Sequence, residues 1–569
     1  MVFRKLACVM TASVVVLGII ALGAAATPAG AATSTAWSIM ASPNSGTTQR
    51  NNLNGVSCTS ATTCTAVGFR FASTSNYQTL IERWNGSTWS IVASPNTSTT
   101  KDNLLRSVSC TSATACTAVG DYDSGTNYQT LVERWNGSTW SIVASPNTST
   151  TQDNVLQSVS CTSATACTVV GNYSNASGPQ TLAEQWNGTT WSIVTSPNTT
   201  TTQNNYLYGV SCTSATACTA VGDYYSGSAF QTLVERWNGS TWSIVASPNT
   251  STTVDNILSS VSCTSATACT AVGHSSLTSG YIQTLVAQWS GTTWSIATSP
   301  STSTTQDNDL LGVACTSATA CAAVGYATTG TSLRQTLTEV WNGTTWSIVA
   351  SPNSSTTQNN FLIGASCTSV TACTGVGSFY NSSFTPQTLV ATTLAAPTIT
   401  SAASTTFTEG SPGSFTVTAL GNPNPTTFTA TGAPNGVVFN TATGVLSGTP
   451  TQAGIFSLTI TASNGIGTAA TQDFTLGVRG LQVSTVALPA ATRGSPYSFQ
   501  LKASGGVTPY TWKKAGALPT GLTLSLTGVL SGTPSTALAA RTFSIAVSVS
   551  DSTPGGRQTV TAVLTLTLH

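Results

Sequence analysis

The chain has 569 residues, of which 40% are hydrophobic and only 6% charged, with a formal net charge of +1. This balance provides no basic face that could neutralise phosphates, and it argues against nucleic-acid binding. The length predicts several domains, and the content of Thr, Val, Trp, Gly and Pro favours an all-β protein.

Residues 1–32 are predicted to be a secretory signal peptide. Arg4 and Lys5 precede the apolar run SVVVLGIIALGAAA, and Ala29-Gly30-Ala31 offers a small-residue cleavage site. A retained membrane anchor is the alternative, but the apolar run is short for a membrane span. The mature protein is therefore expected to be secreted or associated with a cell surface, with no membrane span.

Seven copies of one repeat occupy residues 33–394. The motif SCTSATAC and its variants recur every 51 or 52 residues. The second copy predicts four strands, at 104–110, 115–122, 129–135 and 139–146, with an Asn-Gly hairpin turn between the last two. Four short antiparallel strands with a period near 50 are typical of a β-propeller blade.

The seventh copy is split between the two ends of the repeat region. Its third strand contains QTLV at 387–390, but no fourth strand follows, whereas TAWSIMASPN at 35–44 is a fourth strand without a blade. Together they predict a seven-bladed β-propeller whose ring is closed by the N-terminal strand, which removes exposed sheet edges. A truncated repeat in an open array is the alternative.

The cysteines of the repeats form seven C-x5-C pairs. Each pair flanks a predicted five-residue loop between the first two strands, so the two side chains should face each other across a hairpin. Disulfides are expected in an exported protein, whereas a metal or redox site would lack further ligands. The predicted disulfides are Cys58–Cys64, Cys110–Cys116, Cys161–Cys167, Cys212–Cys218, Cys263–Cys269, Cys315–Cys321 and Cys367–Cys373.

The string GVLSGTP occurs twice after the repeats, at 444–450 and 528–534, among alternating runs such as FSLTITAS and FSIAVSVS. These segments resemble the putative-Ig, cadherin-like modules of bacterial surface proteins. The resemblance implies two Ig-like β-sandwich domains, at 395–479 and 480–569, that act as spacers or adhesion units. Some relatives bind calcium, but the acidic clusters of cadherin-type sites are missing here.

No metal or other cofactor is predicted, and the sequence offers few residues suited to catalysis. His274 is expected in a loop, and one glutamate recurs at the same third-strand position in five copies, which favours a structural role over a catalytic pair. The places left for calcium are the Asp-Asn pairs that end four linkers, and these pairs are interpreted instead as Asx-type turns into the first strand. Their aspartates are the weak calcium candidates. They are Asp102, Asp153, Asp255 and Asp307.

The loops between the second and third strands differ in every copy and should lie on one face. Variable loops rich in Tyr and Asn on a rigid scaffold are typical of binding surfaces, although drift of exposed loops would give the same pattern. The Trp pairs around the Asn-Gly turn are interpreted as packing between blades, with sugar stacking as the alternative. The candidate ligand-binding residues are Tyr122, Tyr128, Tyr173, Tyr224, Tyr225 and Tyr281.

These features predict a secreted or cell-surface binding or adhesion protein whose partner is an extracellular glycan or protein. The alternatives are a purely structural extracellular module and, less favoured, a polysaccharide-active enzyme.

Overall fold

The computed structural model describes residues 36–72, 76–330, 332–369, 371–422, 427–466, 468–552 and 557–569. The predicted signal peptide lies outside these ranges. All secondary-structure elements in these ranges are β-strands, which agrees with the all-β prediction. In this described part of the chain, no helix is long and apolar enough to cross a membrane.

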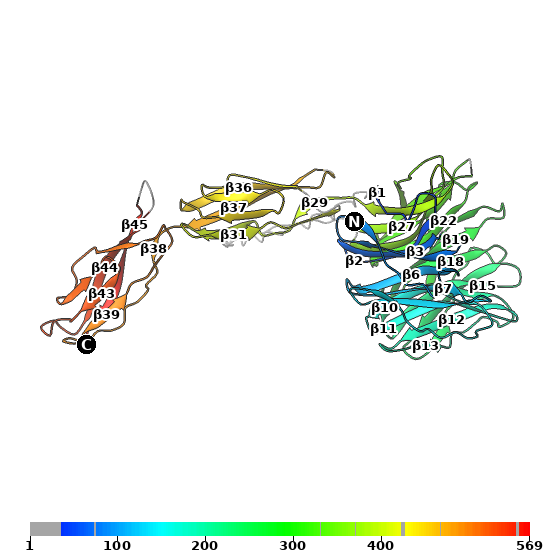
Figure 1. Ribbon diagram of the computed structural model, residues 1–569, viewed down its shortest axis with the longest axis horizontal. Helices are drawn as coiled ribbons and strands as arrows, with labels where there is room; N and C mark the ends of the chain where they lie inside the picture. Colours follow the sequence, from blue (N-terminus) through cyan, green and yellow to red (C-terminus); the bar gives the residue numbers. More distant parts are fainter. Residues whose placement is uncertain are drawn as a thin grey trace, which may run out of the picture. The chain divides into compact units, whose positions relative to one another are not determined.

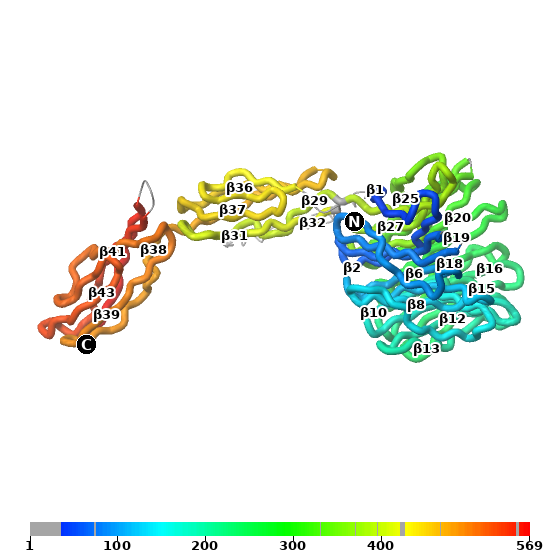
Figure 2. Tube along the Cα trace, in the orientation of Figure 1, coloured from blue at the N-terminus to red at the C-terminus, as the bar shows by residue number. Residues whose placement is uncertain are grey.

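The repeats form seven separate four-stranded antiparallel sheets, whose strands run from blue to green in Figures 1 and 2. The first strands are β2 (Asn51–Ser60), β6 (Asn103–Ser112), β10 (Asn154–Ser163), β14 (Asn205–Ser214), β18 (Asn256–Ser265), β22 (Asn308–Ser317) and β26 (Asn360–Ser369). The second strands are β3 (Thr63–Phe71), β7 (Ala115–Asp123), β11 (Ala166–Asn175), β15 (Ala217–Tyr225), β19 (Ala268–Ser276), β23 (Ala320–Thr328) and β27 (Ala372–Tyr380).

The third and fourth strands of each sheet are shorter than the first two. The third strands are β4 (Tyr77–Trp84), β8 (Tyr128–Trp135), β12 (Gly178–Trp186), β16 (Phe230–Trp237), β20 (Ile282–Trp289), β24 (Arg334–Trp341) and β28 (Pro386–Thr393). The fourth strands are β5 (Trp89–Val92), β9 (Trp140–Ile142), β13 (Trp191–Val194), β17 (Trp242–Ile244), β21 (Trp294–Ala297) and β25 (Trp346–Val349). The fourth strand of the second copy is thus much shorter than the predicted 139–146, because the chain leaves the sheet before Pro146.

The seventh sheet takes its fourth strand from the start of the repeat region, as predicted. Strand β1 (Trp37–Met40) pairs antiparallel with β28, with Trp37 opposite Thr393 and Met40 opposite Val390. The sheet order is β1-β28-β27-β26, which repeats the order of the other six sheets. Strands far apart in the sequence therefore complete one sheet.

Each predicted disulfide is present and joins the first two strands of a sheet. In the second copy Cys110 lies directly opposite Cys116, with the two Cα atoms 4.0 Å apart. The expected five-residue loop is wrong, because β6 continues to Ser112 and β7 begins at Ala115. A register shift between Cys110 and Ser112 absorbs the extra residue, so a tight turn closes the ladder.

Hydrogen bonds between first strands link neighbouring sheets at six of the seven junctions. The Cys110 amide donates to Ser57 Oγ at 2.9 Å, and four further junctions repeat this contact. The Cys58 amide donates to Ser366 Oγ at 3.0 Å, so the seventh sheet contacts the first in the same way. At the one remaining junction Ala314 replaces the serine. The first strands thus contact one another in a circle from β2 to β26 and back to β2.

The chain from 395 to 479 carries its own hydrophobic core, formed by residues such as Phe407, Leu446 and Phe474. Alternate residues of its longest strands are buried, as the alternating sequence runs predicted. The strands are β29 (Ala395–Ile399), β30 (Ser404–Thr408), β31 (Gly413–Thr416), β32 (Ala419–Asn422), β33 (Thr427–Thr431), β34 (Val437–Asn440), β35 (Val445–Gly448), β36 (Gly454–Ser463) and β37 (Ala470–Arg479).

A second core, around Trp512, Leu530 and Ile545, lies in the chain after residue 480. The GVLSGTP string occupies equivalent strands, β35 in the first segment and β43 in the second. The strands are β38 (Gln482–Val483), β39 (Tyr497–Gln500), β40 (Ala503–Ser504), β41 (Thr511–Lys514), β42 (Leu522–Leu524), β43 (Val529–Gly532), β44 (Thr542–Ser550) and β45 (Thr559–Thr567).

Candidate binding cavity

The first strands of all seven sheets line one cavity of about 500 Å³. Such a volume lies within the range of roughly 300–1,000 Å³ found for small-molecule sites. Each sheet contributes at least one side chain, so the lining is assembled from the whole repeat region.

The residues that line this cavity differ from copy to copy, although their neighbours in the sequence hardly change. On β6 the second and fourth residues, Leu104 and Arg106, alternate with Asn103 and Leu105, which are fully buried. Because side chains alternate along a strand, the varying residues share the face opposite the invariant ones. The fourth residues all line the cavity, and they are Asn54, Arg106, Gln157, Tyr208, Ser259, Leu311 and Ile363.

An ion pair with a buried carboxylate holds Arg106 at the cavity wall. Its Nε lies 2.5 Å from Oδ1 of Asp121, which is 1% exposed. Asp121 follows Gly120, where a Cβ atom would lie 1.9 Å from the carbonyl oxygen of Leu104, so only glycine permits this close approach of β6 and β7. Burial raises the pKa of Asp121 above its ordinary value, and the charge of Arg106 opposes the rise.

Tyr208 and His274, which also line the cavity, each form a hydrogen bond with a carboxyl group. Burial raises the pKa of Asp223, at the position of Asp121 in the fourth copy, to about 7, while a hydrogen bond from Tyr208 lowers it. His274 Nδ1 lies 3.0 Å from Asp309 Oδ1. Burial lowers the pKa of His274, but the hydrogen bond and the charge of Asp309 outweigh it, so the pKa is raised overall. The expectation that His274 is a loop residue is wrong, since it belongs to β19.

The lining mixes polar and apolar side chains, and its fourth-position residues change character around the cavity. Five consecutive copies place Asn, Arg, Gln, Tyr and Ser at the fourth position of the first strand, whereas the last two copies place Leu311 and Ile363 there. A scaffold of nearly identical sheets therefore surrounds an asymmetric cavity.

The six predicted tyrosines occupy three kinds of position. Tyr128 and Tyr281 are the most exposed, at 40% and 41%. Tyr225 packs against Phe230, with ring centroids 5.3 Å apart. The other three, at equivalent places on second strands, lie partly buried against the cores between sheets, which limits what they could offer to a ligand; they are Tyr122, Tyr173 and Tyr224.

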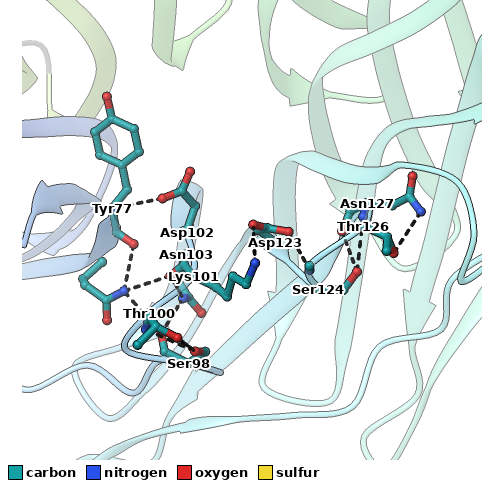
Figure 3. A network of polar contacts seen from close by, with 12 residues as sticks. Tyr77, Ser98, Thr100, Lys101, Asp102, Asn103, Asp123, Ser124, Thr126 and Asn127 are labelled. Carbon is teal, nitrogen blue, oxygen red and sulfur yellow. Dashed lines mark hydrogen bonds and ion pairs between the residues drawn. The ribbon is translucent and has the colours of Figure 1, made fainter. Parts of the chain in front are cut away.

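The four linker aspartates accept hydrogen bonds from the third strand of the preceding copy. Asp102 Oδ1 accepts from the Tyr77 amide at 2.9 Å, while Lys101 reaches Asp123, as Figure 3 shows. Asp153, Asp255 and Asp307 repeat the contact with the amides of Tyr128, Phe230 and Ile282.

In each Asp-Asn pair predicted to form an Asx-type turn, the aspartate makes this contact with the third strand instead. The turn into the first strand is made by the next residue, as when Asn103 Oδ1 accepts from the Thr97 amide at 2.8 Å. Among the described residues no three His, Cys, Asp or Glu side chains lie together as a metal site would require. The prediction is that no metal is bound, and calcium binding by Asp102, Asp153, Asp255 or Asp307 stays the alternative to it.

The recurring glutamates lie between sheets, in accordance with a structural role. Glu133 is fully buried, and Ser94 of the preceding copy donates to its Oε2 at 2.8 Å. Burial raises the pKa of Glu133 to about 8, although the serine hydrogen bond lowers it. The same contact and direction of shift recur at Glu82, Glu184, Glu235 and Glu339.

The Trp pairs are packing residues. Trp135 and Trp140 are 8% and 6% exposed, with ring centroids 5.8 Å apart. Arg83 of the preceding copy lies over the Trp135 ring at 4.5 Å, a cation–π contact that joins two sheets. The interpretation as packing is confirmed for this pair, and its faces are not available for a sugar.

The cavity itself was missed by the prediction from sequence, which placed binding on the loops. The signal was present, because the second and fourth residues of the first strand are the positions that change most within SCTSATAC-type units. Recognising this cavity from the sequence requires aligning the copies and knowing that the seven first strands lie around it.

Comparison with known families finds two matches to the family described as Putative Ig domain, at residues 396–479 and 481–568. Together they cover less than half of the chain, and the repeats lie outside them. These two segments are therefore similar to Ig domains. Among curated proteins no match is found.

Similar solved structures include the Ig1-2 module of the Drosophila receptor protein tyrosine phosphatase DLAR, with 17% identity, 31% of this chain and 99% of that chain covered, and a TM-score of 0.14. Human protocadherin-24 EC1-2 matches with 14% identity, 31% and 98% coverage and a TM-score of 0.15. A protein described as a putative alpha-galactosidase, from Bacteroides fragilis, has 21% identity, 17% and 20% coverage and a TM-score of 0.15. The chain spans about a fifth of the length of the two Bacteroides fragilis structures that it matches. These scores are too low to carry an argument about function.

Proposed function

We propose that the repeats form a closed seven-bladed β-propeller that serves as the binding module of a secreted or cell-surface protein. The circle of contacts between first strands supports closure, above all the hydrogen bond from Cys58 to Ser366. Seven disulfides and the predicted signal peptide support an oxidising, extracellular location. The Ig-like segments would act as spacers or adhesion units.

The observation that carries the proposal is the cavity lining. Its residues vary between copies, whereas the exposed isoleucine of the outermost strand is the same in all seven, as at Ile39, Ile142 and Ile348. Drift in solvent-exposed positions would have changed these isoleucines as well. Diversity at the cavity wall is what ligand recognition requires.

Binding is favoured over hydrolysis and over a purely structural role. Of the described residues that line the cavity, Asp309 alone has a carboxyl group, while most glycoside hydrolases use two that flank the scissile bond. A structural module is the second candidate, because the buried glutamates and linker aspartates serve contacts between sheets. Such a module would not need a varied cavity.

The test is a screen of the full chain against an array of glycans, cell-wall polysaccharides and extracellular proteins, with and without calcium. We expect binding to one component of the array. Ser259→Trp should abolish this binding by filling the cavity, while Ile142→Ser on the outer strand should leave the binding unchanged. A hit unaffected by Ser259→Trp would move binding away from the cavity. A blank array would favour the structural module.

A further inference from the structure

We infer that the central cavity binds a single neutral saccharide unit, with its hydroxyl groups toward Arg106, Gln157 and Tyr208 and an apolar ring face against Leu311 and Ile363. This inference rests on the proposed function and adds the class of ligand and the stoichiometry. Seven equivalent sites would need the same residues in each copy, whereas these lining residues differ in all seven copies.

The charges of the lining are already matched inside the protein. Arg106 is paired with Asp121, and His274 with Asp309. An ionic ligand would have to break one of these pairs or add an unmatched charge to a confined site, which is costly. A neutral ligand leaves both pairs intact.

The polar side of the cavity offers donors and acceptors close together. The guanidinium of Arg106 donates only, and the amides of Asn54 and Gln157 donate and accept. The hydroxyl of Ser259 can do either, whereas that of Tyr208 donates to Asp223 and is left to accept. A ligand with several adjacent hydroxyl groups, each able to donate and accept, would satisfy this mixture. A peptide strand presents its amides on alternating sides and would leave part of the array unpaired.

The apolar side explains why the ligand should be a sugar ring rather than a small polyol. Leu311 and Ile363 come from neighbouring sheets and give the lining two aliphatic side chains, with Gly312 and Gly364 beside them and Asp309 on the same strand as Leu311. The C–H face of a pyranose ring is apolar while its edges are polar, so one unit can use both sides of the cavity. The cavity volume of about 500 Å³ is sufficient for one sugar unit.

The test is isothermal titration of the full chain with neutral mono- and disaccharides, including glucose, galactose, mannose, N-acetylglucosamine and maltose. We expect one site per chain. Gln157→Ala and Leu311→Ser should each weaken binding by about tenfold or more. Both residues are half-buried and carry no structural hydrogen bond of the sheet ladders, and Ile142→Ser is the matched surface control.

The outcomes separate this inference from the proposed function. A stoichiometry near six or seven, or binding unchanged in both cavity variants, would overturn the single central site. If none of these saccharides binds while a protein on the array does so in a manner sensitive to Ser259→Trp, the saccharide class is wrong and the proposed function stands. If nothing binds in either experiment, both fail.

Discussion

Replacing Glu133 by Gln should remove part of the pH dependence of the repeat region. Glu133 is fully buried between two sheets, and its Oε1 has no hydrogen-bond partner among the described residues. Burial raises its pKa from 4.5 to about 8, so the side chain is neutral in the folded protein at pH 7. Glutamine has the same shape, accepts the same hydrogen bond from Ser94 and never ionises.

The raised pKa of Glu133 determines in which pH range this residue contributes to the free energy of unfolding. A group whose pKa is higher in the folded than in the unfolded state contributes stability that is fully present below the unfolded value. For Glu133 this contribution is lost as the pH rises from 4.5 to about 8. Each pKa unit corresponds to about 1.4 kcal/mol, so the loss is at most roughly 5 kcal/mol, and water entry on ionisation would reduce it.

Denaturation by guanidinium, followed by tryptophan fluorescence between pH 5 and pH 9, measures this effect. All tryptophans except Trp512 belong to the repeats, so the signal reports mainly on the seven sheets. Glu133→Gln should match the natural protein near pH 5 and exceed it in stability near pH 9. Asp473→Asn, which changes an exposed carboxylate of the first Ig-like segment, is the control. An equal loss of stability for Glu133→Gln at both pH values would refute a neutral, buried glutamate.

Three other changes test the contacts between and within sheets. Ser366→Ala removes the acceptor of the Cys58 amide and should cost about 1 kcal/mol in urea unfolding; no change would mean that the junction between the last and first sheets does not contribute. The double change Cys110→Ala, Cys116→Ala opens one short loop and should cost about 2 kcal/mol, measured the same way, with no further effect of reductant on that hairpin. Deleting residues 36–44 should expose the edge of β28 and produce oligomers in size-exclusion chromatography, whereas a monomer of unchanged stability would contradict the role of the N-terminal strand.

The sequence predicted the features that repeat locally. The cysteine spacing indicated the disulfides, and the Trp pairs and Asn-Gly turns indicated the outer hairpin, because each depends on residues a few positions apart. The orphan strand at 35–44 was recognisable because its missing counterpart lies in the seventh copy. The length of the turn between Cys110 and Cys116 was not predictable, since a bulge rather than the loop accommodates the extra residue.

Contacts between copies were beyond the reach of pattern reasoning. Asp102 caps a third strand in the preceding copy, which no single repeat reveals. His274 was assigned to a loop because the length of β19 depends on its pairing with β20. The cavity required placing seven first strands around one centre, although the varying residues at its wall were visible in the sequence throughout.

The split seventh sheet has a consequence for how the protein is made. Strand β1 leaves the ribosome early, but its partner β28 is synthesised only after all the intervening repeats. Until then, the edge that Trp37 and its neighbours will pair with does not exist, and the first segment must remain unpaired. Assembly of the repeats is therefore completed by one late, long-range event. Conditions during folding that delay this event would leave a chain with six finished sheets and an exposed edge open to pairing with another molecule.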